Sequence, residues 1–369
     1  MAKVSPSIDE IQQVAAQFPL HGTLTEAVPY GSGHINDTML VSFDQAGASV
    51  RYIFQRINDQ IFKDVPLLME NIARVTQHLT SKEAAEDNRR ALALILTEDE
   101  QPYYRTPEGR FWRVYLFIEK ARTFDKLENA RQAFEAARAF GAFQAALADL
   151  PGEPLRETIP NFHNTTQRFA NLRAAIERNT AGRKDEVAAE IAFALSHEGE
   201  VGRLLDLADK GEIPLRTTHN DTKINNVMLD DATGEGICVI DLDTVMPGLS
   251  LYDFGDMVRT AVSPAAEDEI DLSQIEIRLP VFEALVKGFV EGAGKILTEA
   301  EWQNLVFAGK LMTFEVGIRF LTDYLDGDVY FRTHRPGHNL DRCRTQFRLV
   351  ELLEKQGADL EAIVAKYRS

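Results

Sequence analysis

The chain has 369 residues and a formal net charge of −17, from 57 acidic and 40 basic side chains. This acidic balance argues against nucleic acid and anionic membrane surfaces as partners, because both are bound through basic patches. With 44% hydrophobic and 26% charged residues, we expect a globular protein of one large domain or two lobes. Its start lacks an apolar signal core and no apolar run is long enough to span a membrane, so we expect a cytoplasmic protein. Nothing in the sequence indicates an oligomeric state.

Apolar periodicity in the first part of the chain predicts a helix over residues 8–18, followed by strands over 25–28, 38–43 and 50–57. A Gly-Ser-Gly sequence lies between the first two strands. Glycines allow backbone N–H groups to approach a phosphate, although a plain hairpin turn has the same composition.

The later segments are mainly helical in pattern. A helix at 65–79 and a strand at 110–119 come before helices expected at 127–149, 161–210, 281–293 and 302–325, and a helix pair at 339–365. Thr298 and Glu301 have the spacing of a capping box at the start of the 302–325 helix.

The most informative stretch lies between residues 218 and 243. His219, Asp221, Lys223 and Asn226 precede an apolar run, a polar turn at 230–236 predicts a hairpin, and the second run ends at Asp241. These residue types suit phosphoryl transfer, in which a hydroxyl needs a proton acceptor and the phosphates need Mg²⁺ and a cation.

This pattern, H-x-D-x-K-x-x-N followed by Asp, resembles the catalytic loop of protein kinases. Asn220 replaces the usual Arg, and that variant resembles the aminoglycoside phosphotransferase and choline kinase group. With the segment 240–248, the string is most similar to bacterial N-acetylhexosamine 1-kinases. The resemblance implies an α+β, protein-kinase-like two-lobe fold, with a small antiparallel sheet lobe over 1–117 and a large, mainly helical lobe over 118–369.

The resemblance also implies roles. Asp221 would be the catalytic base and Lys223 would stabilise charge on the transferred phosphoryl group. Asn226 and Asp241 would supply oxygen ligands to Mg²⁺, with ATP as co-substrate. Asp243 would support the metal site or contact a second ion. His219 and Asp253 would give structural support to the loop.

On the nucleotide side, the loop residues Gly31, Ser32, Gly33 and His34 would cover the phosphates. The backbone near Phe117 to Glu119 would contact adenine.

The third strand departs from the kinase pattern. Gln55 falls where a lysine is expected, so either Arg56 substitutes for it or the cation comes from elsewhere, such as Lys63. Glu70 is equally compatible with an ion-pair partner of that cation and with a solvated helix face.

On the acceptor side, the segments 317–325 and 327–331 resemble the same kinases, which implies that Arg319 and Tyr330 contact a sugar. Thr244, next to the metal-binding segment, is a further substrate-binding candidate. The implied reaction phosphorylates the C1 hydroxyl of an N-acetylhexosamine (GlcNAc or GalNAc). The alternatives are a kinase for an aminoglycoside, choline, ethanolamine or homoserine, a nucleotide-binding pseudokinase, and an adaptor that binds a protein partner.

Overall fold

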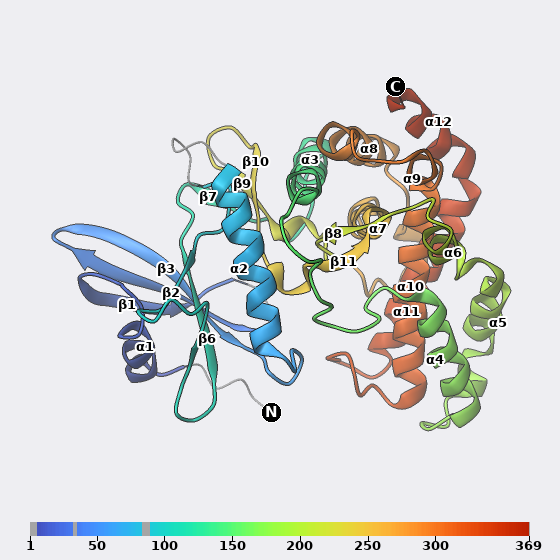
Figure 1. The fold of residues 1–369 in the computed structure, drawn as a ribbon. Coiled ribbons are helices and arrows are strands. Elements are labelled where there is room, and N and C mark those ends of the chain that lie inside the picture. The colour runs from blue at the N-terminus through green and yellow to red at the C-terminus, as the bar shows by residue number, and fades with distance from the viewer. Residues whose placement is uncertain (1–5, 32–34, 83–88, 369) are drawn as a thin grey trace.

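The computed structural model describes residues 6–31, 35–82 and 89–368. An antiparallel sheet in the order β1-β2-β3-β6-β4, with β5 also paired to β6, occupies one side of the molecule, and helices make up most of the other (Figure 1). The sheet strands are β1 (Thr23–Pro29), β2 (Asp37–Gln45), β3 (Ala48–Ile57), β4 (Leu94–Ile95), β5 (Tyr104–Arg105) and β6 (Phe111–Leu116).

The two faces of the sheet are covered differently. Met39, Val41 and Phe43 alternate along β2 and are buried, and they pack in one cluster with helix α1 (Ile8–Ala15). The neighbouring cluster contains residues of helix α2 (Val65–Lys82) and joins the core of the helical part. The second cluster therefore connects the sheet side to the catalytic segments.

Two smaller sheets have the orders β10-β9-β7 and β11-β8. Their strands are β7 (Ala121–Arg122), β8 (Leu215–Thr218), β9 (Val227–Asp230), β10 (Gly236–Val239) and β11 (Met246–Leu249). The remaining helices are α3 (Ala130–Leu147), α4 (Thr165–Arg178), α5 (Ala188–Ser196), α6 (Arg203–Asp209), α7 (Ser250–Ala261), α8 (Leu279–Ala293), α9 (Glu299–Gln303), α10 (Leu305–Asp326), α11 (His338–Lys355) and α12 (Gly357–Tyr367).

Helices α3 and α8 pack with their backbones in close approach, which glycines on both make possible. A Cβ at Gly141 would lie 2.7 Å from the carbonyl oxygen of Phe289, and a Cβ at Gly288 would overlap the carbonyl oxygen of Phe134. Helix α3 also carries Phe140, which packs against His219 in the loop of the catalytic motif. The close contact between α3 and α8 therefore holds in place a helix that supports the site.

Replacing Gly288 with alanine is expected to lower the free energy of unfolding by about 1–3 kcal/mol, because the added methyl group forces the helices apart. Urea denaturation measures this change. The matched control is Gly357→Ala in α12, where no atom lies within 4 Å of the added Cβ. Equal stability of the two variants would contradict the close-packing argument.

The antiparallel sheet and the helical part expected from the sequence are both confirmed. The capping box of Thr298 and Glu301 is also confirmed, with Thr298 N–H donating to Glu301 Oε2 at 2.7 Å. The single helix expected over 302–325 is wrong, because the chain breaks at Asn304, whose side-chain amide donates to the carbonyl of Ala300 at 2.7 Å. The 161–210 region likewise divides at Asn179, a left-handed helix cap.

No helix among the described residues is both long enough and apolar enough to cross a membrane.

Candidate active site

The catalytic motif lies in the loop between β8 and β9, and the hairpin β9–β10 returns the chain to Asp241. Asn220 has φ +65° and Asp241 has φ +60°, both in the left-handed region. Asn and Asp occupy this region more readily than most other residues, which gives a local reason for Asn beside Asp221. At these two residues the chain changes direction, so that the side chains beside them point toward the same region of the site.

His219 and Asp253 lie beneath the loop. The His219 ring is fully buried, packs edge-on against Phe140, bonds through Nε2 to the carbonyl of Ile240 at 2.9 Å, and accepts from Asp221 N–H through Nδ1 at 3.3 Å. The buried carboxylate of Asp253 accepts the backbone N–H groups of His219 at 2.9 Å and Asn220 at 2.7 Å. This geometry supports the structural roles proposed for both residues.

Asp221 forms an ion pair with Lys223, whose Nζ lies 2.9 Å from Asp221 Oδ1. Burial raises the pKa of Asp221, but Lys223, together with His219 and Arg259, outweighs burial, so the pKa lies below its usual value. The side-chain amide of Asn226 donates to the backbone carbonyl of Asp221 at 2.8 Å. The same amide nitrogen lies 3.3 Å from Asp221 Oδ2, so Asp221 is an ionised carboxylate in contact with both Lys223 and Asn226.

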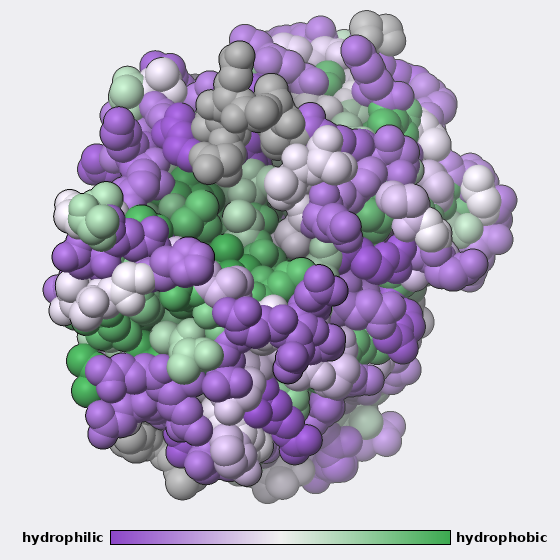
Figure 2. Space-filling view, turned by 60° about the vertical axis from the view of Figure 1, so that its left-hand side comes forward, coloured by the Kyte–Doolittle hydropathy of each residue, from purple (hydrophilic) through white to green (hydrophobic). Residues whose placement is uncertain are grey.

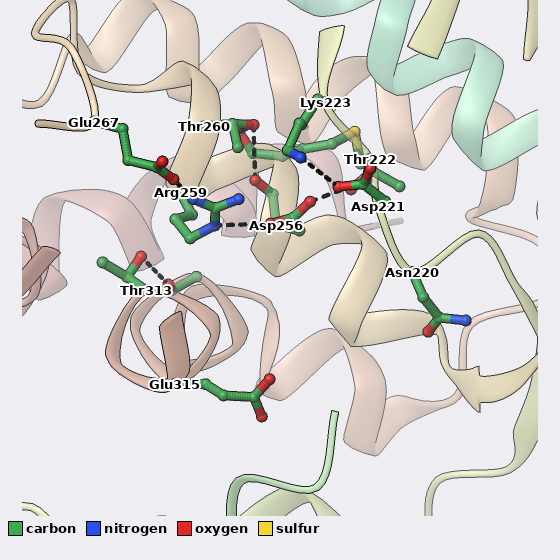
Figure 3. Close-up of polar contacts among 12 residues, drawn as sticks. Asn220, Asp221, Thr222, Lys223, Asp256, Arg259, Thr260, Glu267, Thr313 and Glu315 are labelled. Atoms are coloured by element: carbon green, nitrogen blue, oxygen red, sulfur yellow. Dashed lines mark hydrogen bonds and ion pairs between the residues drawn. The ribbon is translucent and has the colours of Figure 1, made fainter. Parts of the chain in front are cut away.

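A buried ionic network supports the loop from helix α7 (Figure 3). Asp256 accepts from Thr222 N–H at 2.9 Å and from Arg259 Nε at 2.8 Å, and Arg259 also donates to Glu267 at 2.9 Å. The buried Arg259 helps to lower the pKa of Asp221, so the network acts on the loop electrostatically as well as sterically.

Asp241 differs from the neighbouring Asp221 and Asp243 in that no basic side chain of the described residues pairs with it. Desolvation, then repulsion from Asp243 and Asp221, raises its pKa to about 6. Within the described residues, Asp241 has no ion-pair partner, whereas Lys223 compensates Asp221 and Arg113 compensates Asp243. Because the Asn226 amide nitrogen donates to Asp221, its Oδ1 remains available, so a hard divalent cation fits an oxygen site of Asp241 and Asn226.

These groups line a cavity of about 520 Å³ between the sheet and the hairpin. Apolar side chains, including Ile53, Leu92, Met228 and Ile240, line the same cavity. In the space-filling view, hydrophobic residues gather in a recess at the centre of the face, bordered by hydrophilic residues (Figure 2). A cavity whose lining contains both apolar side chains and ionic groups suits a nucleotide, with the base against apolar side chains.

The nucleotide-side predictions have mixed outcomes. Gly31 and Phe117 line the cavity, whereas Ser32, Gly33 and His34 lie outside the described residues. The N–H of Phe117 donates to the carbonyl of Arg51 at 3.0 Å, so it is not free for adenine. In the described part of the chain, the N–H of Ile118 has no backbone acceptor and is the better-placed donor. The Glu119 carboxylate instead pairs with Arg51 and does not line the cavity.

Arg56 is on the wrong face for the role predicted for it. Successive side chains of a strand point to opposite faces, and Gln55 is the one that lines the cavity. Arg56 pairs instead with Asp37 at 2.7 Å and Glu10 at 3.6 Å on the α1 side.

Neither of the other charged candidates near the sheet lines the cavity. Lys63 is exposed and does not contribute to the lining. Glu70 forms an exposed ion pair with Arg156 at 2.6 Å, which agrees with the solvated-face alternative.

The three acceptor-side candidates do not line the cavity either. Thr244 is buried, and its hydroxyl donates to the carbonyl of His219 at 2.7 Å. Arg319 lies between the rings of Phe162 and Phe331, with Cζ 5.7 Å and 5.6 Å from their centroids. Tyr330 is 67% exposed. Phe162 and its neighbour His163 connect Arg319 to the loop, because His163 bonds to the carbonyl of Asn220 at 3.0 Å.

Sequence reasoning missed three residues of this region: Arg113 on β6, Asn36 at the end of the glycine-containing loop, and Arg168 on α4. Arg113 is a charged residue in an otherwise apolar strand, and that exception is a usable signal. Asn36 and Arg168 give no local signal, because their contacts are with residues distant in the sequence.

The fold, the cavity and the motif together define a phosphotransferase that acts on the hydroxyl group of a small molecule. Residues 26–285 match the model of the phosphotransferase enzyme family, APH, and the chain belongs to this family.

Several solved structures share this fold. An aminoglycoside phosphotransferase from Alicyclobacillus acidocaldarius is 14% identical, with TM-score 0.60 over 99% of this chain and 98% of its own. A microcompartment-associated aminopropanol kinase is 14% identical, with TM-score 0.58 over 96% and 99%. A spectinomycin phosphotransferase in complex with ADP and spectinomycin is 12% identical, with TM-score 0.53 over 90% and 92%. The acceptors named in these structures differ, so the shared fold leaves the acceptor open.

Proposed function

We propose that this protein transfers the terminal phosphate of ATP to the C1 hydroxyl of an N-acetylhexosamine, giving ADP and the sugar 1-phosphate. The observation that carries the transfer chemistry is the presence of Asp221, Lys223, Asn226 and Asp241 in the lining of one nucleotide-sized cavity. In the proposed nucleotide site, the base contacts apolar lining residues and the phosphates lie near these four groups, with Gly31 in the same lining.

In the proposed reaction, Asp221 accepts the proton of the C1 hydroxyl as the sugar oxygen forms its bond to the γ-phosphorus. The bond to the oxygen bridging the β- and γ-phosphates breaks, and ADP leaves. The Lys223 ammonium, beside Asp221, offsets negative charge on the transferred group. Asn226 and Asp241 would hold Mg²⁺, which supplies charge neutralisation at the phosphate oxygens.

The charges near the proposed acceptor region favour a neutral, oxygen-rich acceptor over a cationic one. Burial, then repulsion from Arg319, lowers the pKa of Arg168, so the two guanidinium groups are near each other. Neither forms an ion pair in the described residues, and the nearby Glu315 is engaged by His163 at 2.8 Å and by Thr165 at 2.6 Å.

The aromatic pair that could enclose a quaternary ammonium group, Phe162 and Phe331, is occupied by the Arg319 guanidinium. Aminoglycosides, choline and amino alcohols would bring further positive charge to this region. An acetamido carbonyl and sugar hydroxyls would instead accept hydrogen bonds from the arginines.

An acceptor screen with Mg·ATP tests the proposal. The panel contains N-acetylglucosamine, N-acetylgalactosamine, glucose, choline, ethanolamine, 1-amino-2-propanol, homoserine and kanamycin, with ADP release as the readout. We expect both N-acetylhexosamines to be preferred. Phosphorylation at C1 also removes the reducing end, so loss of the reducing-sugar reaction distinguishes it from phosphorylation at another hydroxyl. Preference for an amine-bearing acceptor would overturn the proposal, and absence of ADP release with every acceptor would favour a pseudokinase.

Arg319→Met is expected to raise the KM for the N-acetylhexosamine by about 10- to 100-fold while the KM for ATP stays within about twofold, because charge-assisted hydrogen bonds to the sugar are lost. Steady-state kinetics with each substrate varied in turn measures both constants. The control is Arg173→Met, which removes another arginine near an aromatic ring, 5.6 Å from the Phe169 centroid, on the exposed side of α4. A change of similar size in the control would remove Arg319 from the acceptor site.

A further inference from the structure

Asp243 lies two residues after Asp241 and is only 4% exposed, and both of its carboxylate oxygens are engaged. Oδ1 pairs with Arg113 Nη1, and Oδ2 accepts from the side-chain amide of Asn36 at 2.6 Å. Its backbone carbonyl accepts from the Thr158 hydroxyl at 3.1 Å. With both oxygens occupied by protein donors, Asp243 is poorly placed to bind a metal ion directly.

Arg113 is 1% exposed, and it projects from β6 toward the catalytic segments. It stands opposite Gln55 on β3, and its Nε donates to Gln55 Oε1 at 2.9 Å. It also contacts Met69 of α2, whose Sδ lies 3.9 Å from Nη1, and its Cζ lies 5.4 Å from the centroid of the Tyr115 ring. In a kinase-like site, a lysine would occupy the Gln55 position on β3. Here the positive charge belongs instead to Arg113, on the neighbouring strand β6.

Asn36 ends the loop that begins at Tyr30, and its side chain bridges two parts of the molecule. Its Nδ2 donates to Asp243, while its Oδ1 accepts from Asn58 N–H at 3.0 Å, just beyond the end of β3. Asn58 in turn donates to the carbonyl of Ile35 at 3.2 Å. Asn36, Gln55 and Asp241 all line the same cavity, so these contacts lie beside the proposed phosphate site.

We propose that Asp243, Arg113 and Asn36 form a clasp between the sheet and the metal-binding segment, and that the clasp positions the start of β2 and the cavity-facing side of the sheet relative to Asp241. Arg113 is a positioning residue in this arrangement: it is buried behind Gln55 and acts through Asp243. From β6, Arg113 links the sheet to the metal-binding segment, in place of the lysine that is absent from the third strand. This inference depends on the cavity being the nucleotide site.

Removing one charge alone would leave the other buried and unpaired, and the variant would be destabilised for that reason. The informative variant is therefore Arg113→Met with Asp243→Asn, which removes both charges together. The asparagine keeps an oxygen for the Asn36 amide, and methionine fills much of the arginine volume. A matched control is Arg216→Met with Glu301→Gln, which removes a buried ion pair of 2.9 Å between β8 and α9.

Titration of each folded protein with Mg·ADP by calorimetry needs no acceptor and measures the nucleotide site directly. We expect the Arg113/Asp243 double variant to bind Mg·ADP at least tenfold more weakly and to need a higher Mg²⁺ concentration for half-maximal activity. The Arg216/Glu301 control is expected to lose thermal stability while its Mg·ADP affinity stays within about twofold. Wild-type affinity and wild-type Mg²⁺ dependence in a folded Arg113/Asp243 variant would overturn the clasp.

Asn36→Ala provides a second test that leaves the buried ion pair intact, should the double variant fail to fold. It is expected to weaken Mg·ADP binding by about fivefold or more, and unchanged affinity would also overturn the proposal. The acceptor proposal is tested separately. If the wild-type protein binds Mg·ADP but phosphorylates no N-acetylhexosamine, the acceptor assignment is wrong. The nucleotide titrations still test the clasp in that case.

Discussion

Asp221→Asn is expected to lower kcat by roughly 10²–10⁴-fold, the usual contribution of a general base. Asparagine has nearly the same shape but cannot take the proton of the attacking hydroxyl, and it also removes the ion-pair partner of Lys223. The Mg·ATP dissociation constant should change little, because the nucleotide is proposed to bind along the cavity rather than on this oxygen. Single-turnover kinetics gives the rate of phosphoryl transfer, and calorimetry gives the affinity.

Asp231→Asn is the control for this substitution. Asp231 lies in the turn of the same hairpin and pairs with Arg122 at the surface, away from the cavity lining. Its kcat should match the wild-type value. If Asp221→Asn turned over at a near-normal rate, the assignment of the base would be wrong.

Asp241→Asn is expected to reduce Mg²⁺-dependent turnover by at least about 10³-fold, because metal charge stabilisation contributes several kcal/mol to phosphoryl transfer. Addition of Mg²⁺ should raise the melting temperature of the nucleotide-bound wild-type protein more than that of the variant. A variant that kept wild-type activity and the wild-type Mg²⁺ requirement would exclude Asp241 as a metal ligand.

The pKa of Asp241 gives the same substitution a distinctive pH dependence. In the metal-free folded protein this pKa is raised from 3.8 to about 6, so the ionised carboxylate is disfavoured by folding. Asp241 is exposed, and solvent screens its interactions, so the effect on the free energy of unfolding is small. The resulting loss of stability is present above pH 6 and disappears as the pH falls toward 4. Metal-free Asp241→Asn should therefore melt above the wild-type protein at pH 8, and the difference should shrink below pH 6. Melting curves with EDTA across this range provide the measurement.

The grouping of Asp221, Lys223, Asn226 and Asp241 around one cavity could be predicted from the sequence because these residues are close along the chain. Asp221, Lys223 and Asn226 share one loop, and a short hairpin brings Asp241 back to it. The turn, the strands and the loop are set by local residue preferences, so the spacing alone carries the geometry. The capping box of Thr298 and Glu301 was predictable for the same reason.

Local sequence patterns could not predict contacts between residues that are distant along the chain. Arg113 and Asp243 are 130 positions apart, and only the packing of β6 against the catalytic segment brings them together. The position of Arg56 is an intermediate case. Strand alternation requires Arg56 and Gln55 to face opposite ways, but periodicity does not say which face meets the cavity. Apolar spacing alone predicted a helix that continues through residue 304, whereas in the structure Asn304 separates α9 from α10.

The short connection between β6 and β7 has a consequence for motion of the two halves. Only Phe117 to Lys120 lie between the strands; β7 pairs with β9 of the catalytic hairpin, and the carbonyl of Lys120 accepts from Asp231 N–H at 2.9 Å. Any widening of the cleft must therefore come from rotation about these few residues, and it must also separate Asp243 from its partners on the sheet. We therefore expect this segment to act as the hinge if the two sides of the cavity move apart, and a nucleotide base seated against it to restrain that rotation. Slower amide hydrogen exchange at Ile118 to Lys120 on addition of Mg·ADP is the expected sign, and unchanged exchange there would contradict it.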